Sequence, residues 1–141
     1  MSEKLGVADY PLAEKRPDLV KGKGGKPLAA ITLDAVNRGE VSMNDLSITA
    51  EALMRQAQVA REAGRATLAA NFERAGELCD VPQDEIMRIY ELLRPGRARD
   101  KGPLLEAAKT LRETYGAERM AAFVEEAAAV YERRGLFRFR F

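Results

Sequence analysis

The sequence predicts an all-α fold: an open helical bundle of about three to five amphipathic helices, preceded by an extended, irregular N-terminal arm. Apolar residues recur at spacings of three and four along most of the chain after residue 31, as they do on one face of a helix. Strict alternation, typical of a strand, occurs only in residues 136–141. We therefore predict an arm over residues 1–30, a helical domain over 31–134 and a C-terminal tail over 135–141.

The arm is expected to be irregular because Pro11, Pro17 and Pro27 interrupt a segment without an apolar period. Proline fixes φ and biases the preceding residue away from helix. Residues 22–26 (GKGGK) have the residue types of a phosphate-binding loop. Their spacing and flanking segments do not match one, so we expect a flexible linker.

Three helical segments are predicted in the first part of the domain. Thr32 is placed to cap a short helix over 33–38, which Gly39 ends. Thr49 caps the next helix, which Gly64 ends or bends. A third segment runs from 65 to 79. The residues expected on the buried faces of the last two are Leu53, Ala57 and Ala60, then Leu68, Phe72, Ala75 and Leu78.

Three more helices follow. Pro82 opens one that stops at residues 94–96 (RPG), and Pro103 opens another that Gly116 closes. The last helix covers about 117–134. The expected buried stripes are Ile86, Ile89, Tyr90 and Leu93; then Leu104, Ala108, Leu111 and Tyr115; then Met120, Phe123, Ala127, Val130 and Tyr131.

Composition excludes several function classes. The chain has no histidine, which removes the commonest metal ligand and every Ser/His or Cys/His nucleophile pair. Cys79 is the one cysteine and is expected to be a small buried hydrophobe. With one cysteine, no signal sequence and no apolar stretch of spanning length, the sequence predicts a soluble, cytoplasmic protein.

No catalytic, cofactor-binding or metal-binding residue is predicted. Glu125 and Glu126 point about 100° apart on a helix, so they cannot converge on one substrate, and Glu125 is expected to pair with a nearby arginine. Lys and Arg number 23 against 22 Asp and Glu, so no overall field favours nucleic acid, and the basic loop from Arg97 to Lys101 is expected to be a solvated turn.

Two apolar features indicate contact with another protein. Tyr10-Pro11-Leu12 is an apolar anchor in an otherwise polar arm. In the tail, Phe137, Phe139 and Phe141 alternate with arginine, so they either pack on this chain or dock on another.

The chain resembles the small subunit of diol and glycerol dehydratases over about residues 7–134. The residues that carry the resemblance lie in that family's order and spacing: 7–13 (VADYPLA), 25–28 (GKPL), 31–33 (ITL), 39–41 (GEV), 56–57 (QA), 71–75 (NFERA), 77–78 (EL), 81–82 (VP), Ile86, 89–90 (IY), 93–95 (LRP), Arg97, 122–124 (AFV), 126–128 (EAA) and Tyr131. Some family members carry an N-terminal extension linked to bacterial microcompartments; here the match begins within a few residues of Met1, so the sequence leaves packaging in a microcompartment open.

The resemblance implies a non-catalytic subunit in a heterohexamer of two large, two medium and two small subunits. Adenosylcobalamin would be bound by the partner subunits, and the complex would convert a 1,2-diol into an aldehyde and water by a radical mechanism. This chain would pack on the large subunit and stabilise it, with the contact residues Tyr10, Pro11, Leu12, Asn71, Phe72 and Arg74. The alternatives are a free-standing helical adaptor and, less well supported, a helical nucleic-acid-binding domain. Neither the preference between glycerol and propane-1,2-diol nor the reactivating factor follows from this sequence.

Overall fold

The computed structural model describes residues 3–138, and they are all-α, as predicted. In this range there are seven α-helices, three short 3-10 helices and no strand; an isolated bridge pairs Lys21 with Pro27. The helix count exceeds the predicted three to five. Very short helices account for part of the excess: α1 (Leu12–Lys15) and α2 (Leu33–Asn37) have four and five residues.

The chain forms two compact units, Met1–Cys79 and Asp80–Phe141. The predicted boundary at residue 30 therefore does not coincide with the boundary between the units, which follows Cys79.

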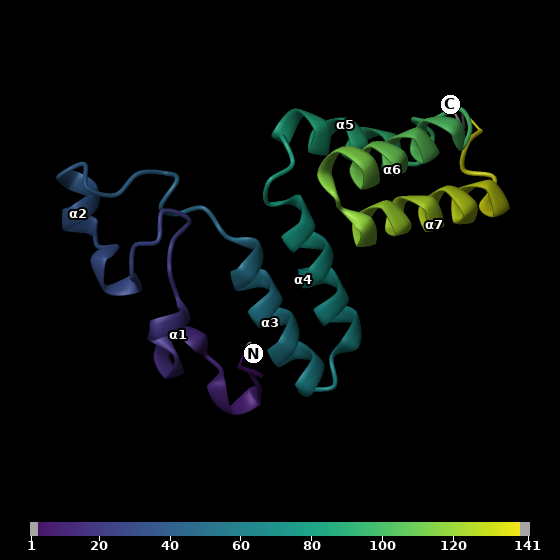
Figure 1. Cartoon of the computed structure of the whole chain (residues 1–141). Coiled ribbons are helices and arrows are strands. Elements are labelled where there is room, and N and C mark those ends of the chain that lie inside the picture. The colour runs from purple at the N-terminus through teal and green to yellow at the C-terminus, as the bar shows by residue number, and fades with distance from the viewer. Residues whose placement is uncertain (1–2, 139–141) are drawn as a thin grey trace. The chain divides into compact units, whose positions relative to one another are not determined.

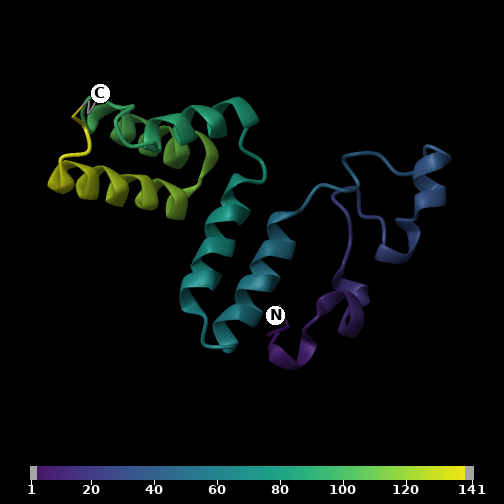
Figure 2. The ribbon, with the colours of Figure 1, turned by 180° about the vertical axis from the view of Figure 1, so that it is seen from behind.

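The first unit is built on α3 (Ala50–Glu62) and α4 (Ala66–Leu78), which lie side by side in Figure 1 and Figure 2. Thr49 caps α3 as predicted, since its Oγ1 accepts the N–H of Ala52 at 3.1 Å. Gly64 makes the turn with φ +75°.

Small residues fill the contact between these two helices. Ala57, Ala60 and Ala69 form one buried cluster, and a Cβ at buried Gly76 would collide with the Met54 side chain. The prediction that Ala75 lies on the buried face of α4 is wrong, because Ala69 and Gly76 let the helices approach closely and Ala75 points outward.

The N-terminal arm is folded rather than extended. It forms η1 (Val7–Asp9), α1 and η2 (Pro17–Leu19). Leu5 and Leu12 are buried against Val59 of α3, and Leu19 and Val20 pack on the same cluster. The leucines at 5, 12 and 19 recur every seven residues, and they supply the apolar contact that the prediction missed.

Residues 21–48, which we call the lobe, contain η3 (Leu28–Ala30) and α2. Thr32 caps α2 as predicted, accepting the N–H of Ala35 at 3.2 Å. In both Figure 1 and Figure 2, α2 lies apart from α3. The lobe's own interior consists of Ala35, Val41 and Asp45.

The second unit contains α5 (Gln83–Leu93), α6 (Gly102–Tyr115) and α7 (Glu118–Arg134). Gly116, with φ +65°, turns the chain from α6 into α7. The buried residues of these last two helices are Leu104, Ala107, Ala108, Leu111, Ala121, Val124 and Ala128. The predicted stripe on α7 is wrong at Phe123, which is exposed; Met120, Ala127, Val130 and Tyr131 are half-buried, and the fully buried residues are Ala121, Val124 and Ala128.

The end of the chain returns to α5 and α7. The Tyr131 hydroxyl donates to the Leu93 carbonyl at 2.5 Å, and the N–H of Gly96 donates to the Leu136 carbonyl at 3.1 Å. Phe137 packs edge-on against Tyr131, with ring centroids 6.1 Å apart. Phe137 thus packs on its own chain, whereas Phe139 and Phe141 lie outside the described residues.

Candidate partner-binding surface

The predicted arm anchor is only partly at the surface. Tyr10 is 56% exposed and Pro11 is exposed, with a cis peptide bond between them. Leu12 is only 6% exposed, because it packs on Leu5 and Val59. Its side chain therefore serves the packing of this chain, and the proposed contact of the arm rests on Tyr10 and Pro11.

The predicted residues on α4 form a local group. Arg74 donates to the side-chain oxygen of exposed Asn71. Phe72 is half-buried against the cluster of Ala57, Ala60 and Ala69. A surface groove of about 220 Å³ is lined by both Phe72 and Tyr10, so the structure brings these two predicted contact residues together.

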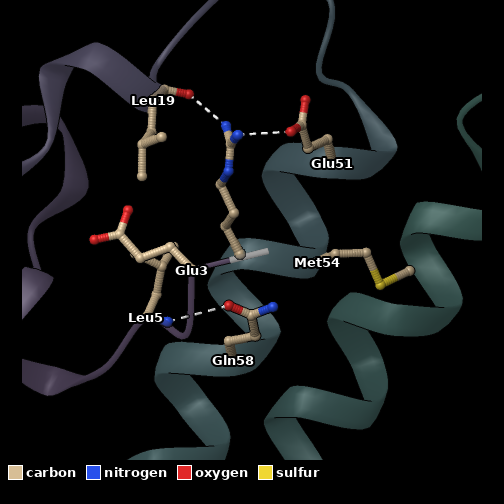
Figure 3. Close-up of a pocket in the computed structure, with 7 residues that line it drawn as sticks. Glu3, Leu5, Leu19, Glu51, Met54 and Gln58 are labelled. Atoms are coloured by element: carbon tan, nitrogen blue, oxygen red, sulfur yellow. Dashed lines mark hydrogen bonds and ion pairs between the residues drawn. The ribbon is translucent and has the colours of Figure 1, made fainter. Parts of the chain in front are cut away.

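A second hollow, of about 390 Å³, lies between the arm and α3 (Figure 3). Its polar groups already bind one another. Arg55 donates to the Leu19 carbonyl and to Glu51, both at 2.6 Å, and the Gln58 amide oxygen accepts the N–H of Leu5 at 3.3 Å. These bonds join the arm to α3, so this hollow has a structural role.

The glycine-rich segment at 22–26 is an ordered turn and not the predicted flexible linker. The N–H of Gly22 donates to the Lys26 carbonyl at 3.0 Å, and the N–H of Gly25 donates to the Gly22 carbonyl at 2.8 Å. Gly25 has φ +83°, which favours glycine. A Cβ at Gly22 would collide with the Asp45 backbone, so glycine is required there for close approach to that residue.

Asp45 is the buried charged residue of the described chain, at 6% exposure. Lys26 Nζ lies 2.9 Å from its Oδ2 and also donates to the Glu40 carbonyl at 2.6 Å. The N–H and Oγ–H of Ser42 donate to the same Oδ2 at 2.9 and 3.2 Å. Bonding by Lys26, and next by the Ser42 backbone, lowers the pKa of the Asp45 carboxyl below its ordinary value.

The lobe exposes a set of large apolar side chains, which we call its apolar face. They come from α2 and from the chain that follows it: Leu33 (75% exposed), Val36, Met43 (79% exposed), Leu46 and Ile48. Sequence reasoning missed them, although a dense run of apolar residues at 28–48 without a helix long enough to bury them was a usable signal.

Outside the Asp45 site, the carboxyl groups with a shifted pKa belong to surface ion pairs. Arginine bonding lowers the pKa values of Asp18, Glu40, Glu85 and Glu125. Glu125 pairs with Arg112 at 2.8 Å, which confirms the predicted arginine partner. Every carboxyl pKa shift resolved in residues 3–138 is downward, whereas a general acid working near neutral pH needs a raised one.

Residues 3–138 contain neither a cluster of metal-ligating side chains nor a helix that could span a membrane. No group of three or more Cys, Asp or Glu side chains in residues 3–138 is placed to hold a metal ion. No helix in this range combines the length and the apolar character needed to cross a membrane.

A family model and two known proteins similar to this chain all point to the same family. A family model described as dehydratase small subunit matches residues 5–138. The propanediol dehydratase small subunit of Citrobacter freundii is 48% identical over 128 residues, which are 91% of this chain and 74% of that protein. The propanediol dehydratase small subunit of Salmonella typhimurium is 47% identical over 133 residues, 94% of this chain and 76% of that protein.

Proposed function

Because this chain belongs to the dehydratase small subunit family, we propose that it is the non-catalytic small subunit of an adenosylcobalamin-dependent diol or glycerol dehydratase. Its role is to bind and stabilise the large subunit. The complete enzyme contains two large, two medium and two small subunits, and it converts a 1,2-diol such as propane-1,2-diol into an aldehyde and water. The two relatives named above are propanediol dehydratase subunits, which supports this substrate class.

We assign adenosylcobalamin to the partner subunits. When bound there, it supplies the radical that starts the reaction. The two hollows described above do not suit a cofactor site: the hollow between the arm and α3 is lined by polar groups that bind one another, and the groove at Phe72 is mainly apolar. The chain has no histidine to offer as a ligand.

The downward carboxyl pKa shifts support a non-catalytic role. Asp45 and Glu125 are held in their charged forms by Lys26 and Arg112, which suits structural ion pairs and not proton transfer to a substrate.

The observation that carries the proposal is the apolar face of the lobe. Leu33 and Met43 are about three quarters exposed on a lobe whose interior is only Ala35, Val41 and Asp45. Several large apolar side chains left exposed on one small lobe are typical of a protein-binding site. A helical chain that keeps such a face in place through the Asp45–Lys26 pair is suited to dock on a larger subunit.

Co-expression with the large and medium dehydratase subunits tests the proposal. We expect this chain to elute with them in size-exclusion chromatography at the mass of a heterohexamer, and adenosylcobalamin-dependent diol dehydration to fall when the chain is omitted. A separate low-mass peak together with full activity in its absence would contradict the proposal and favour a free-standing adaptor.

A further inference from the structure

The groove that Tyr10 and Phe72 share has an apolar floor and a charged rim. The floor includes Val59, which is buried, and half-buried Leu68 and Phe72, while exposed Val7 and Tyr10 form one wall. Arg65, at the N-terminus of α4, lines the same groove and is exposed.

Arg65 differs from the other arginines of the first unit. Arg16, Arg38, Arg55 and Arg61 each form an ion pair with an acidic side chain, and Arg74 donates to Asn71. Arg65 forms no side-chain hydrogen bond or ion pair within residues 3–138.

The nearby carboxylates are already used. Glu62 accepts the N–H of Val7 at the start of η1, and Glu73 lies 2.7 Å from Arg61. The groove therefore combines an apolar floor of about 220 Å³ with one guanidinium that has no acidic partner in the described chain.

We propose that this groove receives an apolar side chain of the large dehydratase subunit, and that a carboxylate next to that side chain pairs with Arg65. Charge complementarity identifies the occupant: the apolar floor selects a large aliphatic or aromatic side chain, and Arg65 selects an Asp or Glu. The inference rests on the proposed function, because it takes the partner to be a dehydratase subunit. It places Phe72 in the floor and Tyr10 in the wall of one binding groove.

Two variants test the apolar and charged parts separately. Ala63→Tyr places a ring in the groove from an exposed position at the end of α3, and Ala66→Tyr is its control, because Ala66 is exposed and does not line the groove. Arg65→Glu reverses the charge at the rim. Arg99→Glu is its control, because Arg99 is exposed, outside the groove and likewise without a side-chain partner in the described residues.

Each variant is co-expressed with tagged wild-type chain and the large and medium subunits, and mass spectrometry of the purified complex gives the ratio of variant to wild type. We expect Ala63→Tyr and Arg65→Glu to be under-represented by about tenfold, and both controls to match wild type. Circular dichroism of each isolated chain verifies that it is helical.

Three results would overturn the inference. If wild type enters the complex and folded Ala63→Tyr and Arg65→Glu enter equally well, the groove is not a contact, while the proposed function stands. If the wild-type chain itself does not enter the complex, both this inference and the proposed function fail. If the isolated chain forms a dimer that Ala63→Tyr separates, the occupant is a second copy of this chain and not the large subunit.

Discussion

Asp45 is buried in the lobe, where its carboxylate binds Lys26 and Ser42 and its backbone touches the glycine turn. A buried charge without partners is strongly unfavourable, so the lobe conformation that provides these partners is selected over others. The position of the apolar face thus depends on one carboxylate.

Asp45→Asn should lower the melting temperature of the chain by about 5 °C, because a neutral amide cannot pair with the Lys26 ammonium and its NH₂ faces other donors. Thermal unfolding followed by circular dichroism measures this. Asp34→Asn, at an exposed position on α2, is the matched control and should have little effect.

The same residue predicts a pH dependence. Since the pKa of Asp45 is lowered in the folded state, its contribution is complete above the unfolded pKa of about 4 and is lost as pH falls through the folded value. Between pH 7 and pH 3 the unfolding free energy of wild type should therefore fall more than that of Asp45→Asn. Denaturant titrations at each pH measure these free energies. If the unfolding free energies of wild type and Asp45→Asn fall in parallel with pH, Asp45 does not contribute to the pH dependence.

Residue size explains where sequence reasoning failed within the helices. Helical spacing placed Phe123 on the buried stripe of α7, but it is exposed, whereas Ala121 and Ala128 are buried. In a pair of closely packed helices the contact favours small residues, and hydrophobicity alone does not distinguish a buried alanine from an exposed one.

At the scale of elements, the α6–α7 pair depends on this close contact. Ala121 is fully buried and Ala122 is exposed, which gives a matched pair of neighbours. Ala121→Leu should reduce the unfolding free energy by about 1–3 kcal/mol, because the added atoms have no space, and Ala122→Leu should change it little. Urea denaturation measures both. If both variants change the unfolding free energy equally, the contact between α6 and α7 is loosely packed.

Local signals at helix ends were the most predictable part of the fold. Thr32, Thr49, Gly39, Gly64 and Gly116 cap or end helices as the sequence predicts, because these roles depend on a residue and its immediate neighbours. The folded arm, the glycine turn and the lobe were not predicted. They depend on contacts between distant residues, such as Leu5 with Val59 and Lys26 with Asp45.

At the scale of the whole molecule, the apolar surface is concentrated where the chain cannot bury it. The lobe has too few residues to form a large core, so its large apolar side chains remain exposed in this chain. The sequence indicated partner contact through Tyr10 and Phe72, which share a groove, but not through the lobe, whose large apolar side chains are exposed.

The double variant Leu33→Asp with Met43→Asp should weaken assembly strongly. If a partner covers both side chains, each contributes about 2 kcal/mol, so each change weakens binding by about 30-fold. Size-exclusion chromatography of the co-expressed complex measures the loss. Asn37→Asp adds charge to the lobe without removing apolar surface, and it should assemble normally. Normal assembly of the double variant would place the interface elsewhere.

The leucines of the arm have a consequence for synthesis of the chain. Leu5, Leu12 and Leu19 are made before Val59, against which they pack, and Val59 follows Leu19 by 40 residues. At typical translation rates that interval lasts about 2–8 s, and the ribosome exit tunnel delays the emergence of α3 further. During this time the leucines have no folding partner in α3 and are available to ribosome-associated chaperones, so this segment is translated before α3 but reaches its final position only after α3 has emerged.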